Sequence, residues 1–90
     1  MAVVERTVQI VNPLGLHARP AAEFVKLATR FKSDVSLTKE DQLVNGKSIL
    51  GVMTLAAECG SQLLIKVDGP DADDAIAALA DLVARGFSEV

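Results

Sequence analysis

One short segment brings together the residues best suited to chemistry, a histidine followed two positions later by an arginine. His17 is the only histidine of the chain and stands at the expected start of a helix, just before Arg19 and Pro20. The first N–H groups of a helix lack internal partners and, with the positive end of the helix dipole, form a site for anions, phosphate above all. Arg19 adds a cation that can bind two phosphate oxygens. These features point to a histidine that can carry a phosphoryl group.

The same surroundings suit both states of such a histidine. The dipole and Arg19 disfavour the protonated imidazolium, which leaves the ring neutral and nucleophilic. Once the ring carries a phosphoryl group, the amides and the guanidinium stabilise its negative oxygens. The alternative interpretation is that His17 is an imperfect helix cap and Arg19 a solvated surface charge. The residues alone leave both interpretations open.

A second candidate is Ser48, which precedes a run of apolar residues. Its hydroxyl can accept a hydrogen bond from the first amides of a helix, so we expect it to be an N-cap. Gly51 weakens that short helix by about 1 kcal/mol relative to alanine. Val52 and Leu55 are the residues of this helix that we expect in the core.

The remaining apolar residues of this helix would stay exposed beside His17. Together with two small residues of the first helix, they would form a docking surface for a protein partner. Because partners in a phosphoryl relay must exchange, such an interface is expected to be small and transient. The residues expected to form it are Ala18, Ala22, Ile49, Leu50 and Met53.

Composition excludes several classes of protein. The 90 residues carry 9 Lys and Arg against 12 Asp and Glu, 9 − 12 = −3, and 3 aromatic side chains, which argues against a nucleic-acid binder. A chain of this length forms one domain, residues 1–90, without room for a large buried cofactor. No apolar run approaches the roughly 20 residues of a membrane-spanning helix, and no apolar leader opens the chain. We therefore expect a single cytoplasmic domain that needs no cofactor.

Other chemistries lack the necessary residues. The sequence has no GxxxxGK[ST] nucleotide-binding loop, and His17 and the distant Cys59 do not form a plausible zinc site. Cys59 is expected to be a structural thiol in a reducing compartment. The acidic residues of the last helix are expected to match its dipole rather than to form a catalytic pair. They are Asp71, Asp73, Asp74 and Asp81.

Hydrophobic periodicity predicts seven elements in the order β-α-β-β-α-β-α. Asp71 is the expected N-cap of the last helix, Arg85 lies in its final turn and Gly86 is its C-terminal cap. One-faced strands and amphipathic helices predict an α+β fold, a four-stranded antiparallel sheet covered on one face by three helices. The strands are expected over 3–11, 35–37, 43–44 and 62–68, and the helices over 18–31, 49–55 and 72–85.

Two segments resemble the signatures of a known family. Residues 12–22, Asn-Pro-Leu-Gly-Leu-His-Ala-Arg-Pro-Ala-Ala, resemble the active-site signature of the histidine-containing phosphocarrier proteins (HPr) of the bacterial phosphoenolpyruvate:sugar phosphotransferase system. Residues 46–53, Gly-Lys-Ser-Ile-Leu-Gly-Val-Met, resemble that family's regulatory-serine signature. Length, element order and motif spacing agree as well. The resemblance implies the family fold, an open-faced β-sandwich.

The resemblance implies a phosphoryl carrier with a transient phosphohistidine rather than a stand-alone enzyme. By this match, phospho-Enzyme I phosphorylates His17 on Nδ1, Arg19 stabilises the phosphate, and the group passes to a IIA-type component for sugar uptake. Ser48 matches the site of an HPr kinase/phosphorylase, where a phosphate would oppose the docking of an acidic partner. A plain capping serine is the alternative at this position.

Two other functions stay open. A nitrogen-related branch of the family keeps the histidine but serves regulatory partners, and a binding-only regulator would leave His17 incidental. The hairpin turn at residues 39–42 departs from the family by lacking Asn-Gly. We expect a monomer that binds no metal and no nucleic acid and does not insert into a membrane.

Overall fold

The chain folds into one antiparallel sheet and a layer of helices, as the computed structural model shows for residues 2–88. The expected element order is confirmed, with a final 3-10 turn, η1 (Gly86–Ser88), added. The strands are β1 (Ala2–Gln9), β2 (Asp34–Lys39), β3 (Gln42–Asn45) and β4 (Gln62–Gly69). The helices are α1 (Ala18–Ala28), α2 (Ile49–Thr54) and α3 (Ala72–Ala84).

The sheet has the order β1-β4-β2-β3, with every pair antiparallel. Alternation along β4 sends Leu63, Ile65 and Val67 into the core, because successive side chains of a strand point to opposite faces. The alternate residues Gln62, Leu64, Lys66 and Asp68 line the open face, where Lys66 lies between Glu5 of β1 and Ser36 of β2. This open, polar face agrees with the expected one-sided covering by helices.

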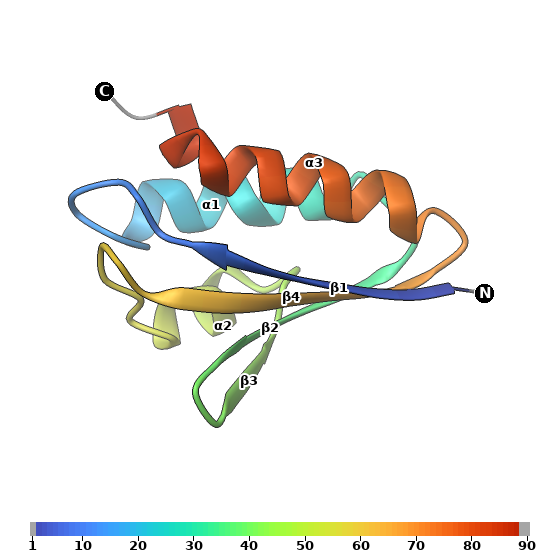
Figure 1. Ribbon diagram of the computed structural model, residues 1–90, viewed down its shortest axis with the longest axis horizontal. Coiled ribbons are helices and arrows are strands. Elements are labelled where there is room, and N and C mark those ends of the chain that lie inside the picture. Colours follow the sequence, from blue (N-terminus) through green and yellow to red (C-terminus); the bar gives the residue numbers. More distant parts are fainter. Residues whose placement is uncertain (1, 89–90) are drawn as a thin grey trace.

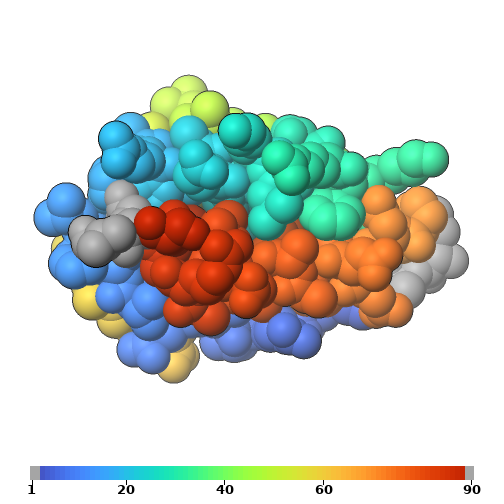
Figure 2. Space-filling view, turned by 90° about the horizontal axis from the view of Figure 1, so that it is seen from above, coloured from blue at the N-terminus to red at the C-terminus, as the bar shows by residue number. Residues whose placement is uncertain are grey.

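The helical layer is built around α1 and α3, which lie side by side over the sheet (Figure 1). Seen from above, α2 comes into view beyond α1, on the side away from α3 (Figure 2). The three helices and the sheet share one core cluster, to which α2 contributes Val52. No helix within residues 2–88 is long and apolar enough to cross a membrane. The α3 residues expected to be buried all are: Ala75, Ile76, Leu79, Leu82 and Val83.

Two elements end two or more residues earlier than the periodicity predicted. The helix expected to reach residue 31 ends at Ala28, because the amides of Arg30 and Phe31 bond to carbonyls three residues back, at 3.1 and 3.2 Å. These bonds make a tighter turn than an α-helix. The first strand ends at Gln9 rather than at residue 11, because the carbonyl of Ile10 accepts from the amide of Gly60 at 2.7 Å, while the amide of Ser61 turns to the carbonyl of Glu58 at 2.9 Å.

Asp71 occupies the expected N-cap position, but the prediction that its side chain caps α3 was wrong. Asp71 precedes α3, but its carboxylate makes no capping bond to that helix. Instead Oδ2 accepts from the Lys32 amide at 2.8 Å, and Oδ1 accepts from the Ser33 amide and hydroxyl at 2.9 and 2.5 Å. The hydroxyl bond from Ser33, followed by the Lys32 amide bond, lowers the pKa of Asp71 below its ordinary 3.8. The carboxylate therefore ties the segment after α1 to the start of α3.

The end of α3 differs from the prediction by one residue. The helix stops at Ala84, so that Arg85 is its C-cap rather than part of the final turn. Gly86 follows with a φ of 64°, the left-handed conformation expected of a C-terminal cap.

Candidate functional site

The loop that leads into α1 is held by a small set of hydrogen bonds. The Asn12 side chain, which is buried, donates from Nδ2 to the carbonyl of Gly15 at 2.6 Å, and the Gly15 amide donates to the carbonyl of Asn12 at 3.0 Å. The next amide, that of Leu16, donates to the carbonyl of Ala57 at 2.8 Å. The residue before His17 is thus anchored to the segment that follows α2.

Gly15 is required at this position for two reasons. Its φ is 68°, a conformation that glycine adopts at little cost. A Cβ on Gly15 would also collide with the carbonyl oxygen of Ala57. Local sequence patterns alone assigned no separate role to Gly15 or to Asn12. The turn signals of residues 12–15 could have indicated a tight loop, whereas its contact with Ala57 is a product of the fold.

His17 lies at the N-cap position of α1, as predicted. Its backbone is extended, with φ −77° and ψ −171°, and its carbonyl accepts the first helical bond, from the Ala21 amide at 3.0 Å. The half-buried imidazole makes no capping bond to the helix, so the interpretation of His17 as a side-chain cap is not supported. The Nε2 atom of the ring is buried from solvent.

The start of α1 is an unneutralised positive helix end. Its first turn contains no acidic residue, whereas the first turn of α3 contains Asp73 and Asp74. Pro20 is buried and has no N–H to satisfy, so the amides of Ala18 and Arg19 are the donors at this end. The Arg19 side chain is exposed on the same turn. An anion beside His17 would therefore meet two amides, a helix dipole and a guanidinium.

Ser48 is the N-cap of α2, as predicted. Its Oγ accepts a hydrogen bond from the Gly51 amide at 3.0 Å, and its own amide donates to the Asn45 carbonyl at 3.2 Å. The preceding residue, Lys47, donates from Nζ to the carbonyl of Phe31 at 2.8 Å and so ties this turn to the end of α1. A Cβ at Gly51 would lie 3.3 Å from Oγ of Ser48, which explains why a glycine is suited to this helix.

An exposed apolar patch lies on α2. Its members are 46%, 75% and 39% exposed, and we call it the α2 patch: Ile49, Leu50 and Met53. Val52 and Leu55 of the same segment are buried, as expected. Because α2 has 6 residues, it is about 9 Å long and separates Ser48 from Ala57, which anchors the loop before His17. The α2 patch therefore lies between Ser48 and the His17 loop. Of the two small residues expected beside it, Ala18 is exposed and Ala22 half-buried.

The other residues singled out in the sequence form no second site among residues 2–88. These residues contain no group of three or more His, Cys, Asp or Glu that could hold a metal ion. Cys59 is exposed rather than packed in the core, with Sγ 3.7 Å from the carbonyl oxygen of Val11. Asp81 pairs with Arg85 at 2.8 Å on the surface of α3.

Comparison with known proteins assigns the family. The family model described as "PTS HPr component phosphorylation site" matches residues 4–85. The phosphocarrier protein HPr of Neisseria meningitidis serogroup A is 45% identical over 87 residues, covering 97% of this chain and 98% of that protein.

Solved structures agree with this assignment. The crystal structure of HPr-C-His from Thermoanaerobacter tengcongensis has a TM-score of 0.92 and 42% identity, covering 97% of this chain and 98% of that one. The crystal structure of an HPr dimer from the same organism has a TM-score of 0.78 and 43% identity, covering 91% and 94%. The chain therefore belongs to the HPr family, the phosphocarrier proteins of the phosphotransferase system.

Proposed function

We propose that His17 accepts a phosphoryl group from phospho-Enzyme I and passes it to a IIA-type component of sugar uptake. The observation that carries this proposal is the position of the imidazole at the start of α1, a helix whose first turn has no carboxylate and bears Arg19. Membership of the HPr family supports the same role, since the family serves the phosphotransferase system and sugar transport.

Transfer takes place through Nδ1 of the ring, because Nε2 is buried. The lone pair of neutral Nδ1 attacks phosphorus, a P–N bond forms, and the bond from phosphorus to the donor atom breaks, with its electron pair staying on the donor. Negative charge on the three phosphoryl oxygens is met by the amides of Ala18 and Arg19 and by the guanidinium of Arg19. In the second step the acceptor attacks phosphorus, and the electron pair of the P–N bond returns to Nδ1.

The α2 patch is the docking surface for both protein partners in this proposal. It lies beside the His17 loop and exposes apolar side chains. The small side chains of the adjoining Ala18 and Ala22 allow a partner to approach closely. A patch of this size suits a transient interface, which a carrier needs in order to release one partner and meet the next.

Phosphorylation of Ser48 would regulate this docking. A phosphate on Oγ adds a charge of about −1.5 to −2 at the N-terminus of α2, where the helix dipole tolerates it. Because Ser48 borders the α2 patch, the added charge would repel an acidic partner without unfolding the helix. An HPr kinase/phosphorylase would be the enzyme that adds and removes this group.

Intact-mass analysis tests the relay. The chain is incubated with phosphoenolpyruvate and catalytic Enzyme I, beside a His17→Ala variant, with an Enzyme I proven active on another carrier. We expect one acid-labile phosphoryl group on the wild type and none on the variant. No gain on the wild type would overturn the relay and favour the binding-only regulator, whose partner binding would survive His17→Ala. Phosphorylation by an Enzyme I of the nitrogen-related system in preference to the sugar system would assign the chain to that branch.

The monomeric state and the cytoplasmic location remain predictions. An HPr of T. tengcongensis has been crystallised as a dimer. The predicted monomeric state is therefore tested by sedimentation at several protein concentrations. A mass twice that of one chain at the concentration used for phosphoryl transfer would contradict it.

A further inference from the structure

Basic residues are concentrated along a groove between α1 and α3, although the chain as a whole is acidic. The groove is lined by 4 of the 9 Lys and Arg residues of the chain. Glu23 is the single carboxylate among the described residues that line it. The four cations are Arg19, Lys26, Arg30 and Arg85.

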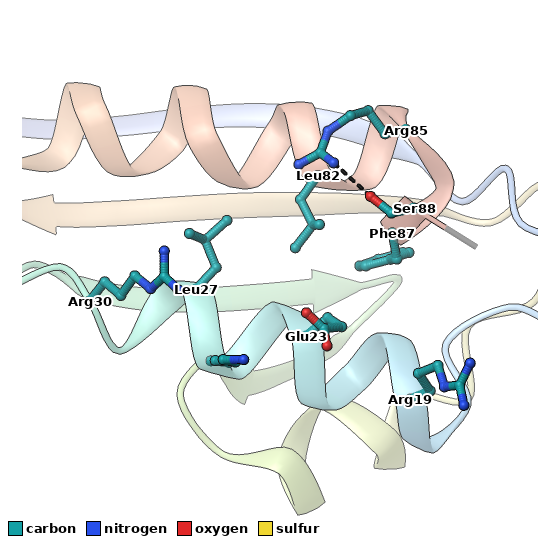
Figure 3. Close-up of a pocket in the computed structure, with 9 residues that line it drawn as sticks. Arg19, Glu23, Leu27, Arg30, Leu82, Arg85, Phe87 and Ser88 are labelled. Atoms are coloured by element: carbon teal, nitrogen blue, oxygen red, sulfur yellow. Dashed lines mark hydrogen bonds between the residues drawn. The ribbon is translucent and has the colours of Figure 1, made fainter. Parts of the chain in front are cut away.

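The groove has an apolar floor and charged rims. Its floor is made by Leu27 of α1, Leu82 of α3 and Phe87 of η1, of which Leu82 and Phe87 are nearly covered. Figure 3 shows Arg30 and Arg19 at opposite ends of the α1 rim with Glu23 between them. On the α3 side, Arg85 is partly neutralised by Asp81 and donates to the Ser88 hydroxyl at 2.7 Å.

The spacing of these charges selects the kind of ligand. Between Arg19 and Ala28, α1 rises by about 14 Å along its axis, and Arg30 lies beyond its end. The outer two cations are therefore farther apart than one phosphate or carboxylate group can bridge. The absence of an exposed aromatic ring along the described floor, where Phe87 is 4% exposed, removes the stacking surface that a single-stranded nucleic acid would use. An extended or helical peptide that carries several carboxylates and a few apolar side chains matches both the rims and the floor.

We propose that the α1–α3 groove binds an acidic segment of a protein partner. The groove and the α2 patch lie on opposite sides of α1 (Figure 2), so that this partner can be bound while the α2 patch is occupied. Apart from Arg19, none of the groove residues belongs to the proposed relay site. Binding of the acidic segment therefore does not require phosphoryl transfer. If the segment does not bind, the proposal that His17 carries a phosphoryl group still stands.

The probe for this proposal is a synthetic peptide of about twelve residues that alternates glutamate and leucine pairs, titrated into the ¹⁵N-labelled chain at low and high salt. We expect amide shifts at Leu27, Arg30 and Ser88, with affinity falling as salt rises, because the contacts are exposed charge pairs. Lys26→Gln with Arg30→Gln should weaken binding about fivefold, since two exposed charge pairs are lost. The matched control, Arg6→Gln with Lys66→Gln, makes the same charge change on the sheet and should leave affinity within about twofold.

Glu23 offers a test in the opposite direction. Glu23→Gln removes the one carboxylate of the rim and should tighten peptide binding about twofold, whereas Glu5→Gln on the open face should leave it unchanged. Equal effects of the groove and control substitutions would overturn the proposal, because they would show a response to net charge alone. Inorganic triphosphate that binds the same residues as tightly as the peptide would overturn it in favour of a small-anion site, and concentration-dependent self-association through the groove would overturn it in favour of a second copy.

Discussion

Replacement of Gly15 by alanine tests whether the loop before His17 is held as the structure indicates. The left-handed backbone at φ 68° costs an alanine about 1–2 kcal/mol. The new methyl group also collides with the Ala57 carbonyl, which must then move away from the Leu16 amide. Loss of that hydrogen bond adds about 0.5–1.5 kcal/mol. We therefore expect Gly15→Ala to lower the free energy of unfolding by about 1.5–3.5 kcal/mol.

Gly60→Ala is the matched control, because Gly60 also has a positive φ, 93°, but no atom lies within 4 Å of the position that a Cβ would take there. It should show the backbone cost alone, about 1–2 kcal/mol. Urea denaturation measures both variants, and the rate of phosphoryl transfer from phospho-Enzyme I reports the position of His17. Gly15→Ala should slow transfer markedly and Gly60→Ala should not. Equal stability and equal transfer rates for the two variants would refute the role assigned to the Ala57 contact.

Three further substitutions test other parts of the structure. Ser48→Ala removes the cap of α2 and should cost about 1 kcal/mol in urea denaturation; no loss would contradict the Gly51 hydrogen bond. The pKa of Asp71 is lowered in the folded state, so its contribution to stability is present above pH 4 and is lost as the pH falls through the folded pKa. The Asp71→Asn variant should therefore be less stable than the wild type at pH 7 and lose less stability between pH 5 and pH 2, as measured by urea denaturation at each pH. The same dependence of stability on pH in both proteins would show that the Asp71 carboxylate does not contribute. Leu50→Ala, at a side chain 75% exposed, should raise the KM for Enzyme I with stability within about 0.5 kcal/mol of wild type. Leu43→Ala, at a side chain 68% exposed on β3, should change neither quantity.

Most of the fold could be predicted because its elements carry strong local signals. The apolar residues of α3 recur at helical spacing, and all of those expected in the core are buried. Element ends were less accurate because they depend on partners elsewhere. The first helix gives way to a tighter turn after Ala28, and β1 stops where the carbonyl of Ile10 accepts from Gly60 instead of Ser61. Neither partner choice is visible in a local pattern.

The site shows the same division. The positions of His17 at the start of α1 and of Ser48 at the start of α2 could be predicted, because N-terminal helix signals lie within a few residues of each other. Asp71 shows the limit of such reasoning. It stands where a cap is expected, yet its carboxylate bonds to Lys32 and Ser33, since the fold brings their amides and a hydroxyl within reach.

The sequence by itself determined which residues can do chemistry and which elements carry them. It placed a histidine and an arginine at a helix start and apolar residues on a short helix, because these features depend on local spacing. The tertiary structure alone decided how they are arranged in space. The anchoring of the His17 loop on Ala57 and the groove between α1 and α3 both join segments far apart in the chain. Such contacts arise only when the helices pack on the sheet to bury one core.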